Sequence, residues 1–235
     1  MKLRSVIIMA FAGLLIGAIA NLPLSWVATK FMPKDNIGAL EYGGTVWNGY
    51  VSEVPGFGPI KIKTSLTKAL TGKPFFNMDT RSANLSAKGS AKPGLLSGVT
   101  VQGNMTHVGA IDPRFAGLVG DFQMTLTELS FDAACKSAKG TVTTDVLTRN
   151  AQKMGWTGPN LSGPVSCEDG AVKMELTGKD AQQSIKAVVS IIPDGTFRAD
   201  VDVLTNDQRA GSILPIFGFQ PKDGGYSLLE SGRWL

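Results

Sequence analysis

Four Asx-Gly pairs constrain the fold of this chain most strongly: Asn48-Gly49, Asp169-Gly170, Asp194-Gly195 and Asp223-Gly224. Both residues of such a pair accept the positive φ angles that tight two-residue hairpin turns require. The flanking segments alternate apolar and polar residues, as a strand with one face in water does. The sequence therefore predicts an all-β fold, an antiparallel meander built as a curved open sheet or as a sandwich.

The alternation places most of the expected strands along the chain. It is clearest where Ile60, Ile62, Thr64 and Leu66 alternate with Lys61, Lys63, Ser65 and Thr67. Further strands are expected at 75–78, 85–87, 94–105, 124–131, 141–147, 165–167, 172–176, 185–192, 197–204 and 226–229. Two short helical segments are expected in addition, one turn at Leu66–Leu70 and one helix within Ala110–Gly120.

The stretch Gly43–Gly49 is predicted to form the opening hairpin. With Asn48-Gly49 as a type I′ turn, Trp47 would lie opposite Tyr50 and Val46 opposite Val51. Gly44 and its glycine neighbour would permit a bend where the first strand enters the sheet. We expect Thr45, Trp47 and Gly49 to shape this hairpin, with Trp47 as its core anchor.

The N-terminus carries an apolar segment that two interpretations explain. Lys2 and Arg4 precede an uncharged apolar run from Val6 to Ala20, and apolar residues continue to Val27. Ala18-Ile19-Ala20 has the small-x-small form of a signal-peptidase site. The continued apolar run instead favours an uncleaved span. The predicted organisation is a cytoplasmic N-terminus at 1–5, a transmembrane anchor at 6–27 and a periplasmic all-β domain at 28–235.

Composition and cysteine usage exclude several classes of protein. The net charge is +4, half of it comes from Lys2 and Arg4, and the remaining charges are scattered, so nucleic acid is not expected as a partner. Two cysteines, Cys135 and Cys167, and a single histidine are too few ligands for a structural zinc site. In an exported chain we expect the two cysteines to form a disulfide that contributes roughly 3–4 kcal/mol.

The sequence contains no motif that supports catalysis, and no cofactor is expected. The only histidine, His107, has no nucleophile in a recognisable arrangement with it. Glu168 and Asp169 are adjacent and would point to opposite faces of a strand. Asp200 and Asp202 share the wet face of their strand. We therefore predict that the chain is not an enzyme and has no catalytic or metal-binding residues.

Several short motifs along the chain are similar to protein N of the bacterial type II secretion system. Leu22-Pro23-Leu24 closes the apolar segment, and Gly44-Thr45-Val46-Trp47-Asn48-Gly49 resembles a Gly-Thr-aliphatic-Trp-x-Gly stretch of that family. Leu161-x-Gly-Pro leads to Cys167-Glu168-Asp169-Gly170. The resemblance ends with 214–219, Gly224-Gly225-Tyr226 and Gly232-Arg233-Trp234, and it matches no motif between Lys68 and Gly120.

This resemblance implies a non-enzymatic accessory component of the machine that exports folded proteins across the outer membrane. It implies a single-pass protein of the bacterial inner membrane with most of its chain in the periplasm. The implied partners are other components of the system, such as the inner-membrane platform proteins and the secretin. The family has no known catalytic residues, so the resemblance assigns none.

Two other classes of function compete with this interpretation. A curved sheet with an apolar face, held by a membrane anchor, could form a groove for lipids lined by Phe75, Phe76, Phe115, Phe122 and Phe131. Core packing is the alternative role of these side chains, and the one that we favour. Apolar side chains on a face without an opposing layer would favour lipid handling, whereas a closed two-layer core would favour a docking module. An exported hydrolase would need a cleft with converging polar groups, and we expect none.

Overall fold

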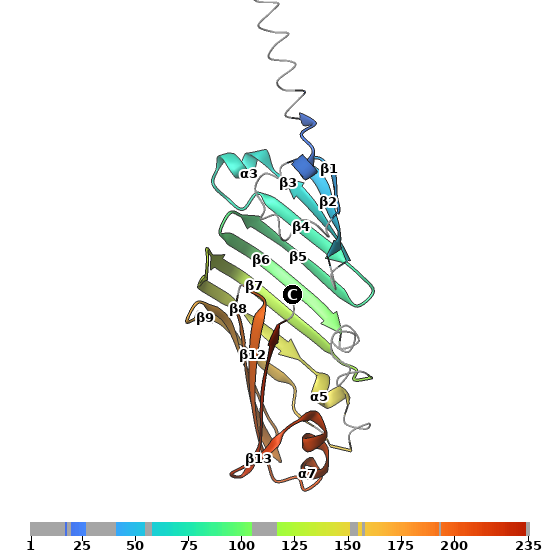
Figure 1. Ribbon diagram of the computed structural model, residues 1–235, viewed down its shortest axis with the longest axis vertical. Coiled ribbons are helices and arrows are strands. Elements are labelled where there is room, and N and C mark those ends of the chain that lie inside the picture. Colours follow the sequence, from blue (N-terminus) through green and yellow to red (C-terminus); the bar gives the residue numbers. More distant parts are fainter. Residues whose placement is uncertain are drawn as a thin grey trace, which may run out of the picture. The chain divides into compact units, whose positions relative to one another are not determined.

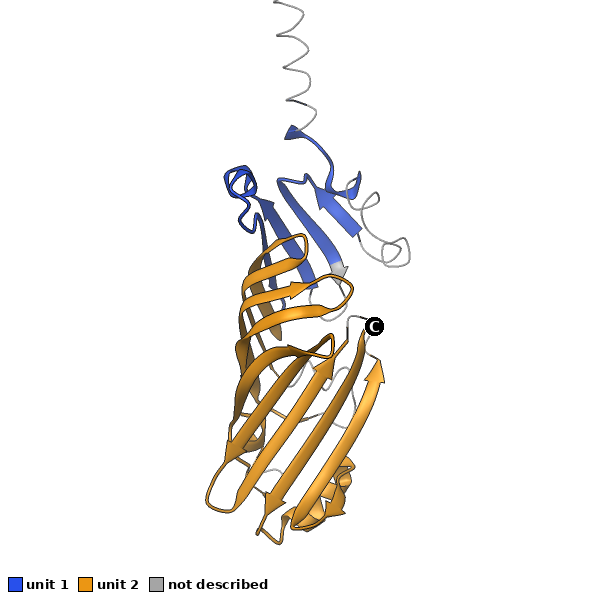
Figure 2. Ribbon diagram, turned by 90° about the vertical axis from the view of Figure 1, so that its left-hand side faces the viewer, with its two compact units in different colours: residues 1–82 blue, residues 83–235 orange. Residues whose placement is uncertain are grey.

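A computed structural model describes residues 17, 20–26, 41–54, 58–104, 117–150, 155–156, 158–192 and 194–233 (Figure 1). These residues form fourteen strands and a few short helices, and neighbouring strands pair antiparallel. The predicted all-β fold is therefore confirmed. The chain divides into two compact units, Met1–Ser82 and Ala83–Leu235 (Figure 2).

Unit 1 contains a sheet whose strands pair in the order of the sequence. These strands are β1 (Glu41–Gly44), β2 (Asn48–Val54), β3 (Gly58–Thr64) and β4 (Phe76–Arg81). Between β3 and β4 lies α3 (Leu66–Leu70), so the predicted helical turn is confirmed. Gly72, with φ of +68°, follows the helix in the left-handed conformation that lets the chain reverse toward β4.

The alternation in β3 sets the two faces of this sheet. Ile60 and Ile62 are half-buried, whereas Lys61 and Lys63 are exposed, as the sequence predicts. Ile60 lies opposite Val51 of β2, and Ile62 lies opposite Met78 of β4. One face of unit 1 is therefore apolar across three strands.

Unit 2 contains ten strands, and all but the last two pair in the order of the sequence. They are β5 (Leu85–Lys92), β6 (Leu95–Asn104), β7 (Asp121–Phe131), β8 (Cys135–Thr144), β9 (Leu161–Glu168), β10 (Ala171–Lys179), β11 (Gln183–Ile191), β12 (Thr196–Thr205), β13 (Gln220–Lys222) and β14 (Gly225–Arg233). β14 pairs with β12, and the short β13 pairs with β14 at the edge. The helices of unit 2 are α5 (Val146–Arg149), α7 (Ala210–Ile213) and η3 (Leu214–Phe217).

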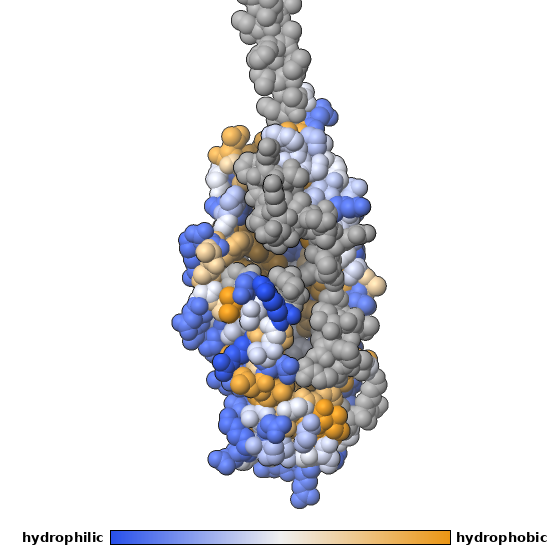
Figure 3. Space-filling model, in the orientation of Figure 1, coloured by the Kyte–Doolittle hydropathy of each residue, from blue (hydrophilic) through white to orange (hydrophobic). Residues whose placement is uncertain are grey.

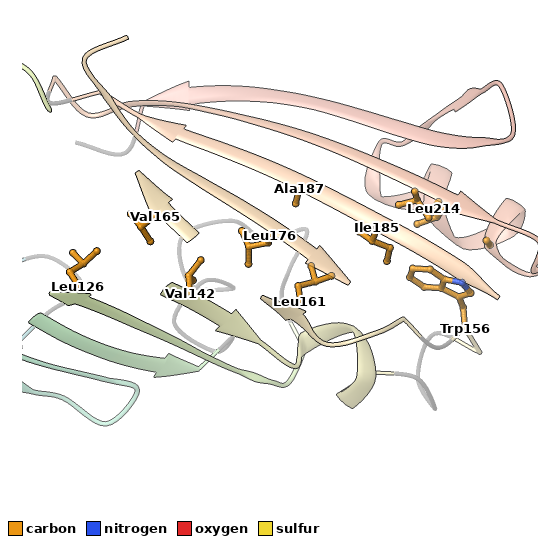
Figure 4. Close-up of a cluster of buried hydrophobic side chains, with 11 residues drawn as sticks. Leu126, Val142, Trp156, Leu161, Val165, Leu176, Ile185, Ala187 and Leu214 are labelled. Atoms are coloured by element: carbon orange, nitrogen blue, oxygen red, sulfur yellow. The ribbon is translucent and has the colours of Figure 1, made fainter. Parts of the chain in front are cut away.

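The hydrophobic core lies in unit 2, between strands that the bend of its sheet brings face to face. Leu126 and Val142 extend from β7 and β8 toward the apolar residues of β10–β12 (Figure 4). Ile185 and Val203, each 2% exposed, belong to the same cluster. Strands β8 and β10 approach each other on either side of β9. At this point β9 and β10 are also close, because a Cβ on Gly163 of β9 would fall 1.6 Å from the Glu175 carbonyl oxygen of β10. Glycine therefore permits the close approach at this bend.

Three of the predicted Asx-Gly turns connect strands, although the strand before Asp223-Gly224, β13, was not predicted. Asp169 and Gly170 have φ of +51° and +78° between β9 and β10, as a type I′ turn requires. Asp194-Gly195 lies in the connection between β11 and β12, and Asp223-Gly224 joins β13 to β14. The predicted helix within 110–120 lies almost wholly outside the described residues, as does His107.

The expected strand at 141–147 is wrong at both ends. β8 begins at Cys135 and stops at Thr144, and α5 starts at Val146. The strand stops at Thr144 because of Asp145, whose carboxylate accepts a hydrogen bond from the Asp121 N–H at 2.7 Å. That bond and the helical bond from Arg149 N–H to the Asp145 carbonyl take the chain out of the sheet despite its β-branched residues.

The predicted transmembrane span falls mostly outside the described residues. Of residues 6–27, the structure describes 17 and 20–26. Within the described part of the chain, no helix has both the length and the apolar character needed to cross a bilayer.

Candidate functional site

The first hairpin forms, but its turn lies two residues earlier than the sequence predicts. Gly44 pairs with Gly49, Gly43 with Tyr50 and Tyr42 with Val51. The turn therefore centres on Val46 and Trp47, and the predicted turn at Asn48-Gly49 with its Trp47–Tyr50 and Val46–Val51 pairs is wrong. Neither Asn48 nor Gly49 has a positive φ.

Side-chain and glycine geometry explain this register. Gly44 has φ of +76°, and the Thr45 hydroxyl accepts a hydrogen bond from the Asn48 N–H at 3.3 Å. The ring of Tyr50 lies over Gly43, where a Cβ would fall 2.2 Å from the ring. An aromatic residue that covers a glycine on the neighbouring strand is a stable cross-strand pair, and it favours this register.

Two other segments of unit 1 form hydrogen bonds with the backbone of the turn. The Val46 N–H donates to the Leu22 carbonyl at 3.0 Å, and Pro23 forms an antiparallel bridge with Thr45. On the other side, the Thr64 N–H donates to the Trp47 carbonyl at 3.0 Å. The Thr64 hydroxyl also donates to the Val46 carbonyl. These tertiary bonds occupy the peptide groups of the turn, which local turn propensity cannot anticipate.

Residues Leu22–Leu24, here called the strap, therefore dock on the turn of the first hairpin. Gly49 is buried at this contact, and a Cβ there would fall 2.7 Å from Leu24 Cδ2 and 2.8 Å from the Thr45 carbonyl oxygen. The absence of a side chain at Gly49 makes room for the strap. Of the predicted motif residues, Thr45 and Gly49 contact the strap, together with Val46, whereas Gly44, Trp47 and Asn48 shape the turn and its bonds within the sheet of unit 1.

A disulfide joins Cys135 and Cys167, with 5.6 Å between the two Cα atoms, as the sequence predicts. It links the first residue of β8 to β9, just after the tight turn at 132–134 that separates β7 from β8. The Cys135 N–H donates to the Gly170 carbonyl at 2.8 Å. The disulfide and this bond fix the end of the β8–β9 pair next to the Asp169-Gly170 turn.

A polar cluster that sequence reasoning missed surrounds α5. Arg149 bonds Asp145 at 2.7 Å and Asp121 at 2.8 Å. Burial alone would raise the pKa of the Asp145 carboxyl, but hydrogen bonds from the Asp121 N–H and the Arg149 guanidinium outweigh it and lower this pKa. The cluster therefore ties the start of β7 to α5, and its partial exposure suits a structural role.

Asn150 and Trp156 are buried polar residues that the sequence did not single out. Asn150 is 0% exposed, and its side chain bonds both the N–H and the carbonyl of Val119 as well as the Val146 carbonyl. Trp156 is 2% exposed and belongs to the core cluster (Figure 4). Both follow α5 in a stretch without apolar periodicity, so the sequence offers no signal for their burial.

The five phenylalanines that could line a lipid groove or pack in a core lie in different parts of the chain. Phe75 and Phe76 belong to unit 1, and their ring centroids are 4.3 Å apart. Phe122 and Phe131 belong to unit 2, where the Phe122 ring lies over Gly103 and Phe131 is 39% exposed. Phe115 lies outside the described residues. Among the described residues no group of three or more His, Cys, Asp or Glu side chains could hold a metal ion.

Comparison with known proteins identifies one family. A family model described as type II secretion system (T2SS), protein N matches residues 35–229. No curated protein and no solved structure matches the chain. The matched range covers well over half of the chain and contains the first hairpin, both cysteines and η3.

Proposed function

The chain belongs to the family of type II secretion system protein N, and from this we propose that it is a non-enzymatic accessory component of that system in the bacterial inner membrane. Its strands would lie in the periplasm and its N-terminal segment in the membrane. The family implies interaction with other type II secretion components. Among these we propose the inner-membrane platform proteins and the secretin as partners.

The family match over residues 35–229 carries this proposal, and the docked strap supports the membrane arrangement. The strap directly follows the apolar run 6–20 and is bonded to the sheet at Val46, so the membrane segment that we propose would end before Leu22 rather than at Val27. A domain bonded so close to a membrane segment would be held near the bilayer surface. This arrangement would suit a component that works beside an inner-membrane platform.

The Cys135–Cys167 disulfide supports the periplasmic location. Disulfides persist in oxidising compartments such as the periplasm and are rare in the cytoplasm. Trapping cells with acid and alkylating their thiols tests the location directly. In the proposed location both cysteines resist alkylation until a reductant is added. Alkylation of both without reductant, in cells whose periplasmic marker protein is oxidised, would contradict the periplasmic location.

The role in secretion is tested by affinity capture of the tagged full-length chain from gently solubilised membranes. Proteins and lipids in the eluate are both identified. Platform proteins or the secretin are expected to be enriched over a capture with an unrelated single-pass periplasmic protein carrying the same tag. Stoichiometric phospholipid without any secretion component would overturn the proposal.

Lipid handling is the second candidate, and one observation in unit 1 favours it. Ile60, Ile62 and Met78 share the apolar face of the sheet and are half-buried rather than buried. Among the described residues of unit 1, burial is limited to Gly49, Val51 and Thr80. Unit 2, by contrast, has a core between facing strands, which favours a docking module. The lipid analysis of the captured chain decides between the two.

A further inference from the structure

Helix α3 presents apolar side chains to solvent. Leu66 is 57% exposed and Leu70 is 87% exposed, and no residue of this helix is buried. Residues four apart lie on the same face of a helix, so the two leucines form one apolar ridge. Figure 3 shows hydrophobic colour gathered over α3 at the upper end of unit 1. A paired, exposed leucine ridge contributes nothing to a core and is typical of a contact surface.

The ridge is held in place by the residues around it. The Ser65 N–H donates to the Phe75 carbonyl at 2.9 Å, and the Lys73 N–H donates to the Lys68 carbonyl at 3.0 Å. Lys68 Nζ donates to Asn77 Oδ1 of β4 at 3.2 Å. The Ser65 and Lys68 bonds hold the helix beside the start of β4, and the Lys73 bond closes the turn that follows the helix, so the leucines are displayed from a fixed base.

The ridge also lies at the end of unit 1 that receives the N-terminal segment. α3 begins two residues after Thr64, which bonds Val46 and Trp47 of the hairpin turn. Val46 in turn bonds Leu22 of the strap. This short series of bonds places α3 and the strap at the same end of unit 1 (Figure 1). Any bilayer that holds the apolar N-terminal run would therefore lie on the side of the ridge.

Lysines predominate in the chain around the ridge, and the nearest acidic residue in the sequence, Asp79 of β4, lies opposite Lys61 of β3. Between Gly58 and Met78 the chain contains Lys61, Lys63, Lys68 and Lys73 and no acidic residue. All four lysines are exposed. Apolar side chains flanked by lysines match the surface of an anionic bilayer, where leucines enter the acyl region and ammonium groups meet phosphates.

We infer that α3 is a second membrane contact, which inserts Leu66 and Leu70 into the surface of an anionic bilayer beside the N-terminal segment. This inference rests on the membrane location proposed above. Two contacts would fix the tilt of unit 1 against the membrane, which a single contact does not do. Lys68 and Lys73 would lie against lipid phosphates.

Quenching by lipids brominated in the acyl chain tests this contact. The full-length chain is reconstituted into vesicles of phosphatidylglycerol and phosphatidylethanolamine, and the variant Leu70→Trp is compared with the parent chain. The matched control is Ile216→Trp, since Ile216 of η3 in unit 2 is 76% exposed. The tryptophan added at position 70 is expected to be quenched about two-fold or more, and the tryptophan at position 216 little.

Flotation of the chain with vesicles, measured beside the quenching, separates this inference from the membrane location on which it rests. If the chain floats with vesicles but the tryptophan at position 70 is no more quenched than that at position 216, the inference is overturned and the location stands. If the full-length chain does not float with vesicles, both the inference and the membrane location fail.

The charge contribution is tested by Lys73→Glu, which should reduce quenching at position 70 in anionic vesicles and leave it unchanged in phosphatidylcholine. An equal reduction in both lipids would overturn the role of the lysines.

Discussion

Gly49 is the residue at which the N-terminal segment and the sheet of unit 1 meet. Its missing side chain leaves room for Leu24, and two backbone oxygens, from Gly43 and Thr45, lie within 3 Å of the position a Cβ would take. A flexible leucine can move away from an added methyl group, but backbone oxygens in a paired hairpin cannot do so without breaking its bonds. The close contact is therefore set by the backbone.

We accordingly expect Gly49→Ala to destabilise unit 1 by about 1–3 kcal/mol, because the methyl group overpacks the hairpin. Urea unfolding of the purified chain, followed by tryptophan fluorescence, measures this change. Gly17→Ala is the control, since no atom lies within 4 Å of a Cβ placed there. A Gly49→Ala chain as stable as the Gly17→Ala chain would show that the hairpin backbone leaves room for a side chain at position 49.

Asn150 holds the segment before β7 against α5 through a fully bonded side chain. Replacing it with aspartate keeps its size but places a carboxylate oxygen against the Val119 and Val146 carbonyls, which now receive N–H donors. We expect Asn150→Asp to cost about 3 kcal/mol or more, because a buried charge loses its partners. Asn206→Asp is the control at an exposed position. Denaturant midpoints that shift equally in both variants would contradict this assignment.

At the scale of elements, the disulfide fixes the end of the β8–β9 pair. Removing it restores freedom to the unfolded chain, so Cys135→Ser with Cys167→Ser should lower the free energy of unfolding by about 2–4 kcal/mol. Adding reductant to the natural chain should reproduce this loss, and the double variant should not respond to reductant. A response of the double variant would show that reductant acts elsewhere.

The contact between α5 and β7 should be sensitive to acid. The pKa of the Asp145 carboxyl is lowered in the folded chain, so its contribution to stability is complete above about pH 4 and is lost as the pH falls through the lowered value. Asp145→Asn should therefore reduce stability at pH 7 and much less at pH 2. Asp132→Asn, which removes an exposed partner of Lys136, should change stability little at either pH. Equal losses at both pH values for Asp145→Asn would exclude an electrostatic role.

The Asx-Gly pairs show how far the sequence alone predicts these elements. Asp169-Gly170 forms the expected turn because the β9–β10 pairing runs up to it, with Glu168 opposite Ala171, and the Cys135 bond to the Gly170 carbonyl is compatible with that register. Asn48-Gly49 does not, because the strap and Thr64 bond the backbone two residues earlier and Tyr50 covers Gly43. Strand alternation reports which face is wet, so β3 and β12 were predictable. A hydrogen bond from a segment distant in sequence leaves no local pattern, so the position of the first turn could not be predicted.

At the scale of the whole molecule, the two units are stabilised in different ways. Unit 2 buries Leu126, Val142, Ile185 and Val203 between facing strands and carries the disulfide. Unit 1 buries little of its apolar face among the described residues, and backbone bonds with the strap close its first hairpin. The family could be predicted from motifs in both units. The difference in packing could not be predicted, because half-buried and fully buried strands show the same alternation of apolar and polar residues.

Hydrogen exchange of the full-length chain should reveal this difference. Amides of β2 and β3 are expected to exchange on the order of 100-fold faster than those of β11 and β12, since local opening requires less buried apolar surface to be exposed. Reducing the disulfide should accelerate exchange in β8 and β9 and leave β2 and β3 unchanged. Vesicles that shield unit 1 should slow exchange in α3 and β3 while β11 and β12 keep their rates. Uniform protection across both units, with and without vesicles, would mean that the chain opens as one cooperative structure and that the thin packing of unit 1 has no energetic consequence.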